Sequence, residues 1–169
     1  MSLKFRAPLK LTLAALLLLP FAAPTLEAQA PPTKRIDPCA LLTKAEIQEA
    51  LGKPVQDGKP NPNANPAVGL PCQYVVGDFG AFSILVKATG PGETPGRVQS
   101  ELNKTKMKTA DAPGIGDRSF FSFPGYGMVQ LNTFKGSWYV IMTLMVPGLT
   151  EDALKAPAEK LMKMVLPKL

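Results

Sequence analysis

The sequence predicts an α+β fold, in which an antiparallel sheet of about five strands carries amphipathic helices packed mainly on one face. Strand-like segments occur in groups joined by short glycine-containing turns, and such hairpins build antiparallel sheets. Three further segments have apolar residues at helical spacing behind a threonine cap. The expected order is α-ββ-α-βββ-α, with one disulfide.

The first thirty residues have the pattern of a secretory signal peptide. Basic side chains precede an apolar run at 11–19, and the Ala-Gln-Ala sequence at 28–30 suits signal peptidase. The apolar run is shorter than the roughly 20 residues that a bilayer-spanning helix needs. We therefore expect a periplasmic or secreted protein, with an uncleaved N-terminal anchor as the alternative. No lipobox cysteine follows the leader, so no lipid anchor is expected.

Residues 31–36 form a proline-containing lead-in, and residues 37–169 form one domain. The two cysteines, Cys39 and Cys72, both lie in the exported part, where an oxidising compartment favours an intramolecular disulfide. Such a bridge would close a loop of about 33 residues and contribute about 3–4 kcal/mol. No free thiol is expected in the mature protein.

The first helix is predicted from Thr43, which forms a capping box with Glu46, to Gly52, which is typical of the residue just past a helix end. Residues 53–71 are rich in Pro, Asn and Gly and predict a long loop, with a short edge strand around Val55. Loops of this length in a compact domain are either functional or loosely ordered.

Five strands are expected in two groups. Residues 72–76 and 82–86 read as a hairpin, and residues 119–123, 128–134 and 138–146 make the second group. Both faces of 138–146 are largely apolar, which predicts a central strand.

Two further helices complete the domain. Thr94 and Pro95 open a surface helix that passes through Leu102. Thr150 caps the last helix, in which Pro157 should either kink the helix or mark its true start. The apolar stripe of this last helix consists of Leu154, Ala158, Leu161, Met162 and Val165.

The segment Asp-Pro-Cys-Ala-Leu-Leu-Thr at 37–43, followed by Glu46 and by Leu51-Gly52, resembles the start of a family of small exported bacterial proteins and lipoproteins of unknown function. Members are best represented in actinobacteria. The segments 72–74 and 114–117 and the closing helix are similar too. The resemblance implies an exported α+β domain with a disulfide between the two cysteines. It implies no activity and no catalytic residues.

Histidine is absent, which excludes His-dependent nucleophile systems and His-based metal sites. With both cysteines oxidised, no thiolate chemistry is expected. Candidate carboxylates show no spacing that predicts convergence; they are Glu93, Glu101, Asp111 and Asp117. The Gly-Ile-Gly-Asp segment at 114–117 precedes a strand, so it predicts a tight turn and not a phosphate loop. The methionines are expected in the core. No cofactor and no metal are expected.

The net charge of +6 falls to +4 without residues 1–30, which hold three basic groups and one acid. This charge is too small and too dispersed to predict a nucleic-acid partner. The densest basic cluster is Lys104, Lys106 and Lys108. We interpret it as a solvated face, with weak attraction to an anionic membrane or polymer surface as the alternative.

An aromatic segment is the least ordinary local feature: Phe120, Phe121, Phe123 and Tyr126 cannot all point to one face of a strand. If part of it is exposed, it is a binding surface; if helices cover both sides, it is core. Representatives of the candidate binding surface are Asn61 and Asn63 in the loop, together with Phe121 and Tyr126.

The function that these observations favour is an exported, non-enzymatic envelope domain that binds a protein partner, a lipid or a cell-wall component. One alternative is a periplasmic hydrolase that uses carboxylates or a Ser/Lys pair. Another is a purely structural envelope protein. No transmembrane span is expected after cleavage of the leader.

Overall fold

The computed structural model of the protein describes residues 35–65 and 68–169. The signal peptide predicted for residues 1–30 lies outside the described residues, as does most of the lead-in. The helical elements are η1 (Pro38–Ala40), α1 (Lys44–Leu51), α2 (Pro95–Lys104), α3 (Glu151–Val165) and η2 (Leu166–Lys168). The strands are β1 (Lys59–Pro60), β2 (Cys72–Val76), β3 (Gly80–Ala88), β4 (Lys108–Asp111), β5 (Arg118–Gly125), β6 (Met128–Lys135) and β7 (Trp138–Met145).

The strands form one antiparallel sheet in the order β1-β2-β3-β7-β6-β5-β4. The α+β class and the antiparallel sheet are confirmed, but the sheet has seven strands and not about five. The two additional strands, β1 and β4, are the edges. Each is short and polar, so neither has the apolar alternation by which a strand is recognised in a sequence.

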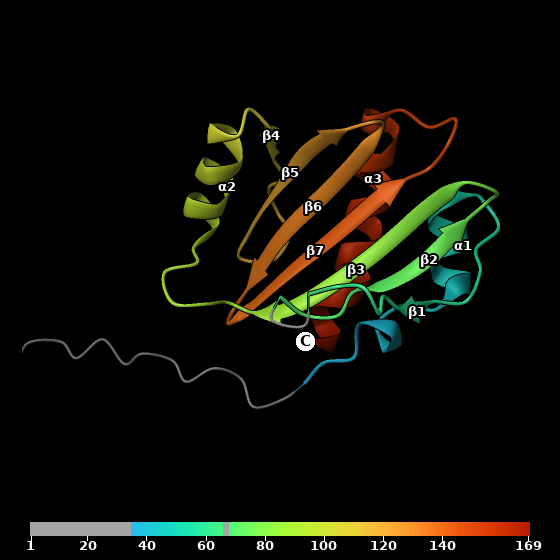
Figure 1. Cartoon of the computed structure of the whole chain (residues 1–169), viewed down its shortest axis with the longest axis horizontal. Coiled ribbons are helices and arrows are strands. Elements are labelled where there is room, and N and C mark those ends of the chain that lie inside the picture. Colours follow the sequence, from blue (N-terminus) through green and yellow to red (C-terminus); the bar gives the residue numbers. More distant parts are fainter. Residues whose placement is uncertain (1–34, 66–67) are drawn as a thin grey trace, which may run out of the picture.

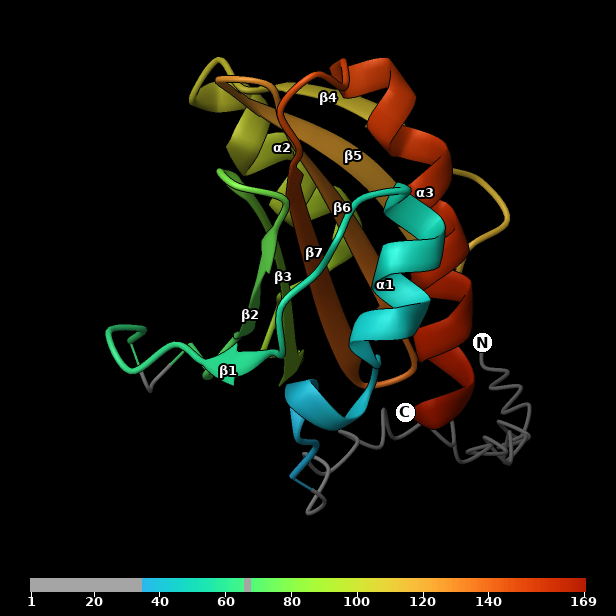
Figure 2. The same ribbon diagram turned by 90° about the vertical axis from the view of Figure 1, so that its right-hand side faces the viewer.

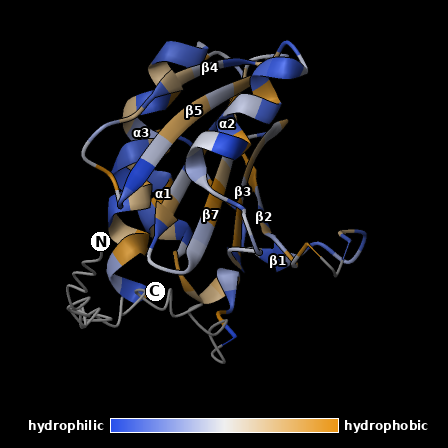
Figure 3. Ribbon diagram, turned by 90° about the vertical axis from the view of Figure 1, so that its left-hand side faces the viewer, coloured by the Kyte–Doolittle hydropathy of each residue, from blue (hydrophilic) through white to orange (hydrophobic). Residues whose placement is uncertain are grey.

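Helices lie on both faces of the sheet, as Figures 1 and 2 show. We call the face under α1 and α3 the inner face and the opposite face the outer face. On the outer face, Val98 and Leu102 of α2 pack against a second small cluster of Phe120, Phe134 and Tyr139. The helices carry alternating hydrophilic and hydrophobic bands, which is the pattern of amphipathic elements (Figure 3).

β7 is the middle strand, as its two apolar faces predicted. Its even-numbered residues face α1 and α3, and Met142 pairs with Ile84 on one side and Leu131 on the other. The outer side is only partly covered: Ile141 and Met145 remain half-buried.

The predicted stripe of α3 is fully buried against the inner face. The helix begins at Glu151, six residues before Pro157, with Thr150 accepting a hydrogen bond from the Ala153 N–H. Pro157 therefore does not mark the start of the helix. The burial of the stripe outweighs the cost of an interior proline, which is about 3 kcal/mol.

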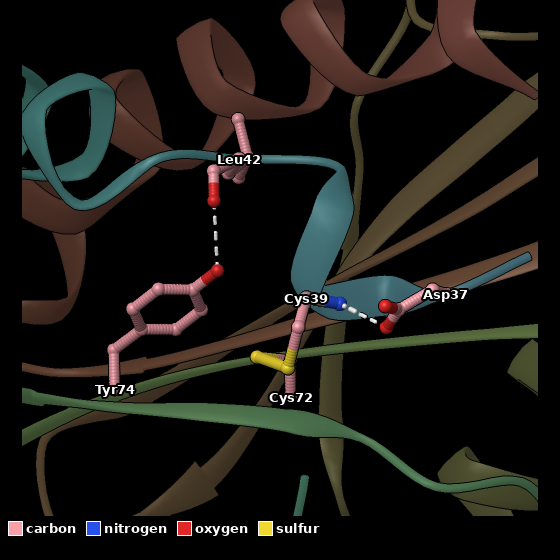
Figure 4. The surroundings of a disulfide bond; sticks show 5 residues. All are labelled: Asp37, Cys39, Leu42, Cys72 and Tyr74. Atoms are coloured by element: carbon pink, nitrogen blue, oxygen red, sulfur yellow. Dashed lines mark hydrogen bonds between the residues drawn. A yellow bond between two sulfur atoms is a disulfide. The ribbon is translucent and has the colours of Figure 1, made fainter. Parts of the chain in front are cut away.

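The disulfide between Cys39 and Cys72 is present and ties η1 to the start of β2, with the two Cα atoms 5.0 Å apart. Figure 4 shows its surroundings: the Tyr74 hydroxyl donates to the Leu42 carbonyl at 2.8 Å, and the Asp37 carboxylate accepts the Cys39 N–H at 2.9 Å. The chain entering α1 is thus held against the sheet covalently and by hydrogen bonds. The capping box of Thr43 and Glu46 then starts α1 as predicted.

The long loop does not leave β2 unpaired. The N–H of Gln56 donates to Val75, the N–H of Gly77 donates to Pro54, and Val55 forms an isolated bridge with Val76. The segment from Pro54 to Pro60 therefore covers the edge of β2, which satisfies backbone groups that would otherwise be exposed.

Candidate binding surface

Phe121, which was predicted for a binding surface, belongs to the core. Its side chain is 3% exposed on the inner face, and Phe120 on the outer face is covered by α2. Helices thus cover Phe120 and Phe121 on the two faces of the sheet, whereas Tyr126 in the same segment is exposed. The sequence pattern alone could not show this, because the position of α2 depends on contacts with strands that are distant in the sequence.

Asn61 and Asn63 lie in the loop before β2. The Asn61 carboxamide oxygen accepts the Asn63 N–H at 2.9 Å, and the Asn61 N–H donates to Pro71, next to the start of β2. Tyr126 lies in the β5–β6 turn, which is at the other end of the strands. The structure therefore does not bring the two asparagines and the tyrosine together.

Tyr126 belongs instead to a group of turns that meet at one end of the sheet. The register places Met128, Met145 and Ala81 side by side, so the β5–β6 turn, the end of β7 and the β2–β3 turn are neighbours. Because Lys108 pairs with Phe123, the α2–β4 turn lies there as well. We call this end, which runs from the top of Figure 1 to its right-hand side, the tip end.

Two large side chains project from the tip end into solvent. Tyr126 is 93% exposed in the β5–β6 turn, and Phe79 is 82% exposed in the β2–β3 turn. Among the described residues these are the most exposed large hydrophobic side chains. A row of apolar residues on the outer face lies beside them and consists of Val75, Ala81, Met145 and Met128. Exposed apolar side chains gathered in this way are typical of interaction sites.

Left-handed backbone conformations also concentrate there. Within 35–65 and 68–169, the two non-glycine residues with positive φ are Tyr126 at 56° and Lys106 at 64°, and both lie in turns of the tip end. Gly125 and Gly127 flank Tyr126 with φ of 93° and 70°. A bulky side chain in this conformation costs of order 1–3 kcal/mol, and such outliers cluster at functional sites.

The charges of the tip end are partly paired. Lys104 contacts Glu101 at 2.8 Å, and Lys155 contacts Asp152 at 2.6 Å. In each pair the hydrogen bond and the charge of the lysine lower the pKa of the carboxyl group. The ammonium groups of Lys108 and Lys155 also lie 5.4 and 5.2 Å from the centre of the Phe123 ring. Lys108 and Lys155 therefore lie beside the end of β5, close to the β5–β6 turn.

The candidate carboxylates do not converge on a catalytic centre. Asp111 contacts Arg118 at 2.8 Å, and Asp117 accepts the Gly136 N–H at 2.6 Å, which links the turn at 114–117 to the β6–β7 turn. Burial raises the pKa of Glu93, but hydrogen bonds from Gly90 and Lys87 and the charge of Lys87 outweigh it and leave the pKa lowered. Among the described residues, no group of three or more Cys, Asp or Glu side chains could hold a metal ion.

A chain of hydrogen bonds on the outer face is a feature that the sequence analysis missed. The Tyr139 hydroxyl donates to Asn132 at 2.6 Å, and Asn132 donates to Ser122 at 2.9 Å. Ser122 donates to Gln130, and Gln130 donates to Thr143, each at 3.2 Å. Burial, and secondarily the charge of Glu93, raise the pKa of Tyr139. These side chains satisfy one another and hold β5, β6 and β7 in register.

No family model, no curated protein and no solved structure matches this chain. In the part of the chain that the structure describes, no helix is both long enough and apolar enough to cross a lipid bilayer.

Proposed function

We propose that this protein is an exported, non-enzymatic envelope domain that binds a partner through its tip end. The observation that carries the proposal is the projection of Phe79 and Tyr126 from separate turns at the same end of the sheet. The partner belongs to one of three classes: a protein, a lipid or a cell-wall component. Export is supported by the disulfide, since such bonds persist in oxidising compartments.

A binding role explains why an aromatic side chain occupies position 126. A turn with three consecutive positive φ angles is most easily built from Gly or Asn. Tyr126 accepts the strain without burying its ring, so the ring contributes little to the stability of the folded chain. The apolar surface of the ring is therefore free to be buried against a partner.

Site-specific photocrosslinking in cells that make the protein tests this proposal. Benzoylphenylalanine at position 79 or 126 keeps an aromatic ring at each tip, and the same residue at the exposed positions 40 and 163 serves as the control. We expect adducts of one defined mass class at 79 and 126 and none at the control positions. Absence of adducts at 79 and 126, in variants that fold normally, would leave the structural role as the better description.

A further inference from the structure

We propose that the partner at the tip end is the surface of a lipid bilayer, with Tyr126 and Phe79 inserted at the interface and Lys106 against the headgroups. This inference rests on the proposed function and names its ligand class. It concerns the tip end as a whole: the two aromatic side chains, the row of apolar residues beside them and the surrounding lysines.

The shape of the tip end favours a bilayer over a single ligand. Phe79 and Tyr126 project from two turns that are separated by the end of β7. Both are almost fully exposed, so they do not line a common pocket. Two hollows of the described residues lie along α1 and beside α2, and neither Phe79 nor Tyr126 lines either of them. Two side chains that project separately can both insert into a deformable surface such as the interface of a bilayer.

The side-chain chemistry is that of an interfacial anchor. Tyrosine combines an apolar ring with a hydroxyl group and is enriched where bilayers meet water. Phenylalanine adds apolar area, and Met128 and Met145 lie half-buried behind the two tips. Aromatic and apolar residues with nearby lysines are the composition of segments that lie in the membrane interface.

The charges are compatible with an anionic surface. Two carboxylates, Glu101 and Asp152, are engaged by lysines. The described lysines at this end are Lys53, Lys104, Lys106, Lys108 and Lys155. The described acids there are Asp78, Glu101, Glu151 and Asp152, so the net charge of the tip end is +1. Lys106 is exposed beside the β5–β6 turn and has no acidic partner among the described residues. Each such lysine strengthens attachment to anionic lipid by about fivefold.

The tip end also lies away from both ends of the described chain. The chain enters at η1, which is fixed to the start of β2 by the disulfide, and Lys168 near the C-terminus donates to the Leu41 carbonyl. Both described ends therefore lie opposite the tip end (Figure 1). A bilayer could approach the aromatic tips without displacing any element of the fold.

Vesicle flotation of the processed, full-length exported protein tests the inference. The probes are vesicles of phosphatidylcholine alone and of equal parts phosphatidylcholine and phosphatidylglycerol. The test variant Y126G/F79S removes both rings, and K106G removes one charge; Gly suits the left-handed backbone at 106 and 126, so these two changes do not strain the fold. The matched controls, L70S and K163Q, change exposed residues outside the tip end.

We expect the wild type to float with vesicles, and Y126G/F79S to lose at least about tenfold in its partition coefficient. K106G should lose about fivefold with the anionic mixture only, and the controls should match the wild type. Tryptophan fluorescence gives a second readout: F79W should shift to the blue and be quenched by brominated lipid, whereas L70W should not. Absence of flotation, or flotation that the tip variants leave unchanged, would overturn the inference.

The two proposals fail in distinguishable ways. If benzoylphenylalanine at 79 and 126 captures one protein while the wild type does not float, the binding function stands and the lipid assignment falls. If neither vesicles nor crosslinks report on the tip end, both proposals fall.

Discussion

Tyr126 has a left-handed backbone, which is uncommon for a bulky residue, and a nearly fully exposed side chain. The ring contacts little of the protein, so the strain of the left-handed conformation is not offset by packing. Lys106 combines a left-handed backbone with an exposed side chain in the neighbouring turn. At the scale of single residues, the tip end therefore contains residue types that do not favour the left-handed backbone conformation they adopt.

The first prediction concerns this strain. Tyr126→Gly should raise the free energy of unfolding by up to about 1 kcal/mol, because relief of the left-handed strain slightly exceeds the entropy that glycine adds to the unfolded chain. Urea unfolding followed by circular dichroism measures the difference. Tyr126→Ala keeps the Cβ atom and should show no gain. A loss of stability in the glycine variant would show that the ring supports the fold.

At the scale of elements, some helices and strands can be recognised from their local sequence pattern and others cannot. The three helices carry threonine caps, and the central strands carry apolar alternation. β1 and β4 carry neither signal, because an edge strand has one unpaired side and needs no apolar pattern. The disulfide is predicted only in part by the sequence. Its pairing follows from there being two cysteines, whereas its role in tying η1 to the sheet depends on where β2 lies.

The second prediction concerns that role. The double variant Cys39→Ser/Cys72→Ser should lose about 2–4 kcal/mol of unfolding free energy, since the bridge fixes η1 and the loop to the sheet. Urea unfolding of the variant and of the chemically reduced wild type should give the same value. The tip end lies at the other end of β2, so vesicle flotation should be retained by folded variant protein. A loss below about 0.5 kcal/mol would indicate that the contacts of α1 and Tyr74 hold this segment unaided.

At the scale of the whole molecule, the two faces of the sheet differ in how they are closed. The inner face is sealed by α3, whose five stripe residues are fully buried. The outer face is covered in part by α2, which buries none of its residues completely. The uncovered part of the outer face continues into the tip end, so the least protected surface and the projecting aromatic side chains are contiguous.

The third prediction follows from this difference. Backbone amides of α2 should exchange with deuterium through openings of lower free energy than those of α3, because few apolar contacts hold α2 in place. Native-state hydrogen exchange with mass spectrometry measures both in one sample, with β7 as the internal reference for global unfolding. Coincident exchange of α2 and α3 would contradict this account.

By itself, the sequence determined the α+β class, the three helices with their caps, the central position of 138–146 and the pairing of Cys39 with Cys72. These features depend on local periodicity, on capping chemistry and on the number of cysteines, which are properties of short segments. Only the tertiary structure decided that Phe121 is core, that β1 and β4 are strands, and that Phe79 and Tyr126 share one end. Each of these depends on strand register between segments that are distant in the sequence, and no local pattern encodes that register.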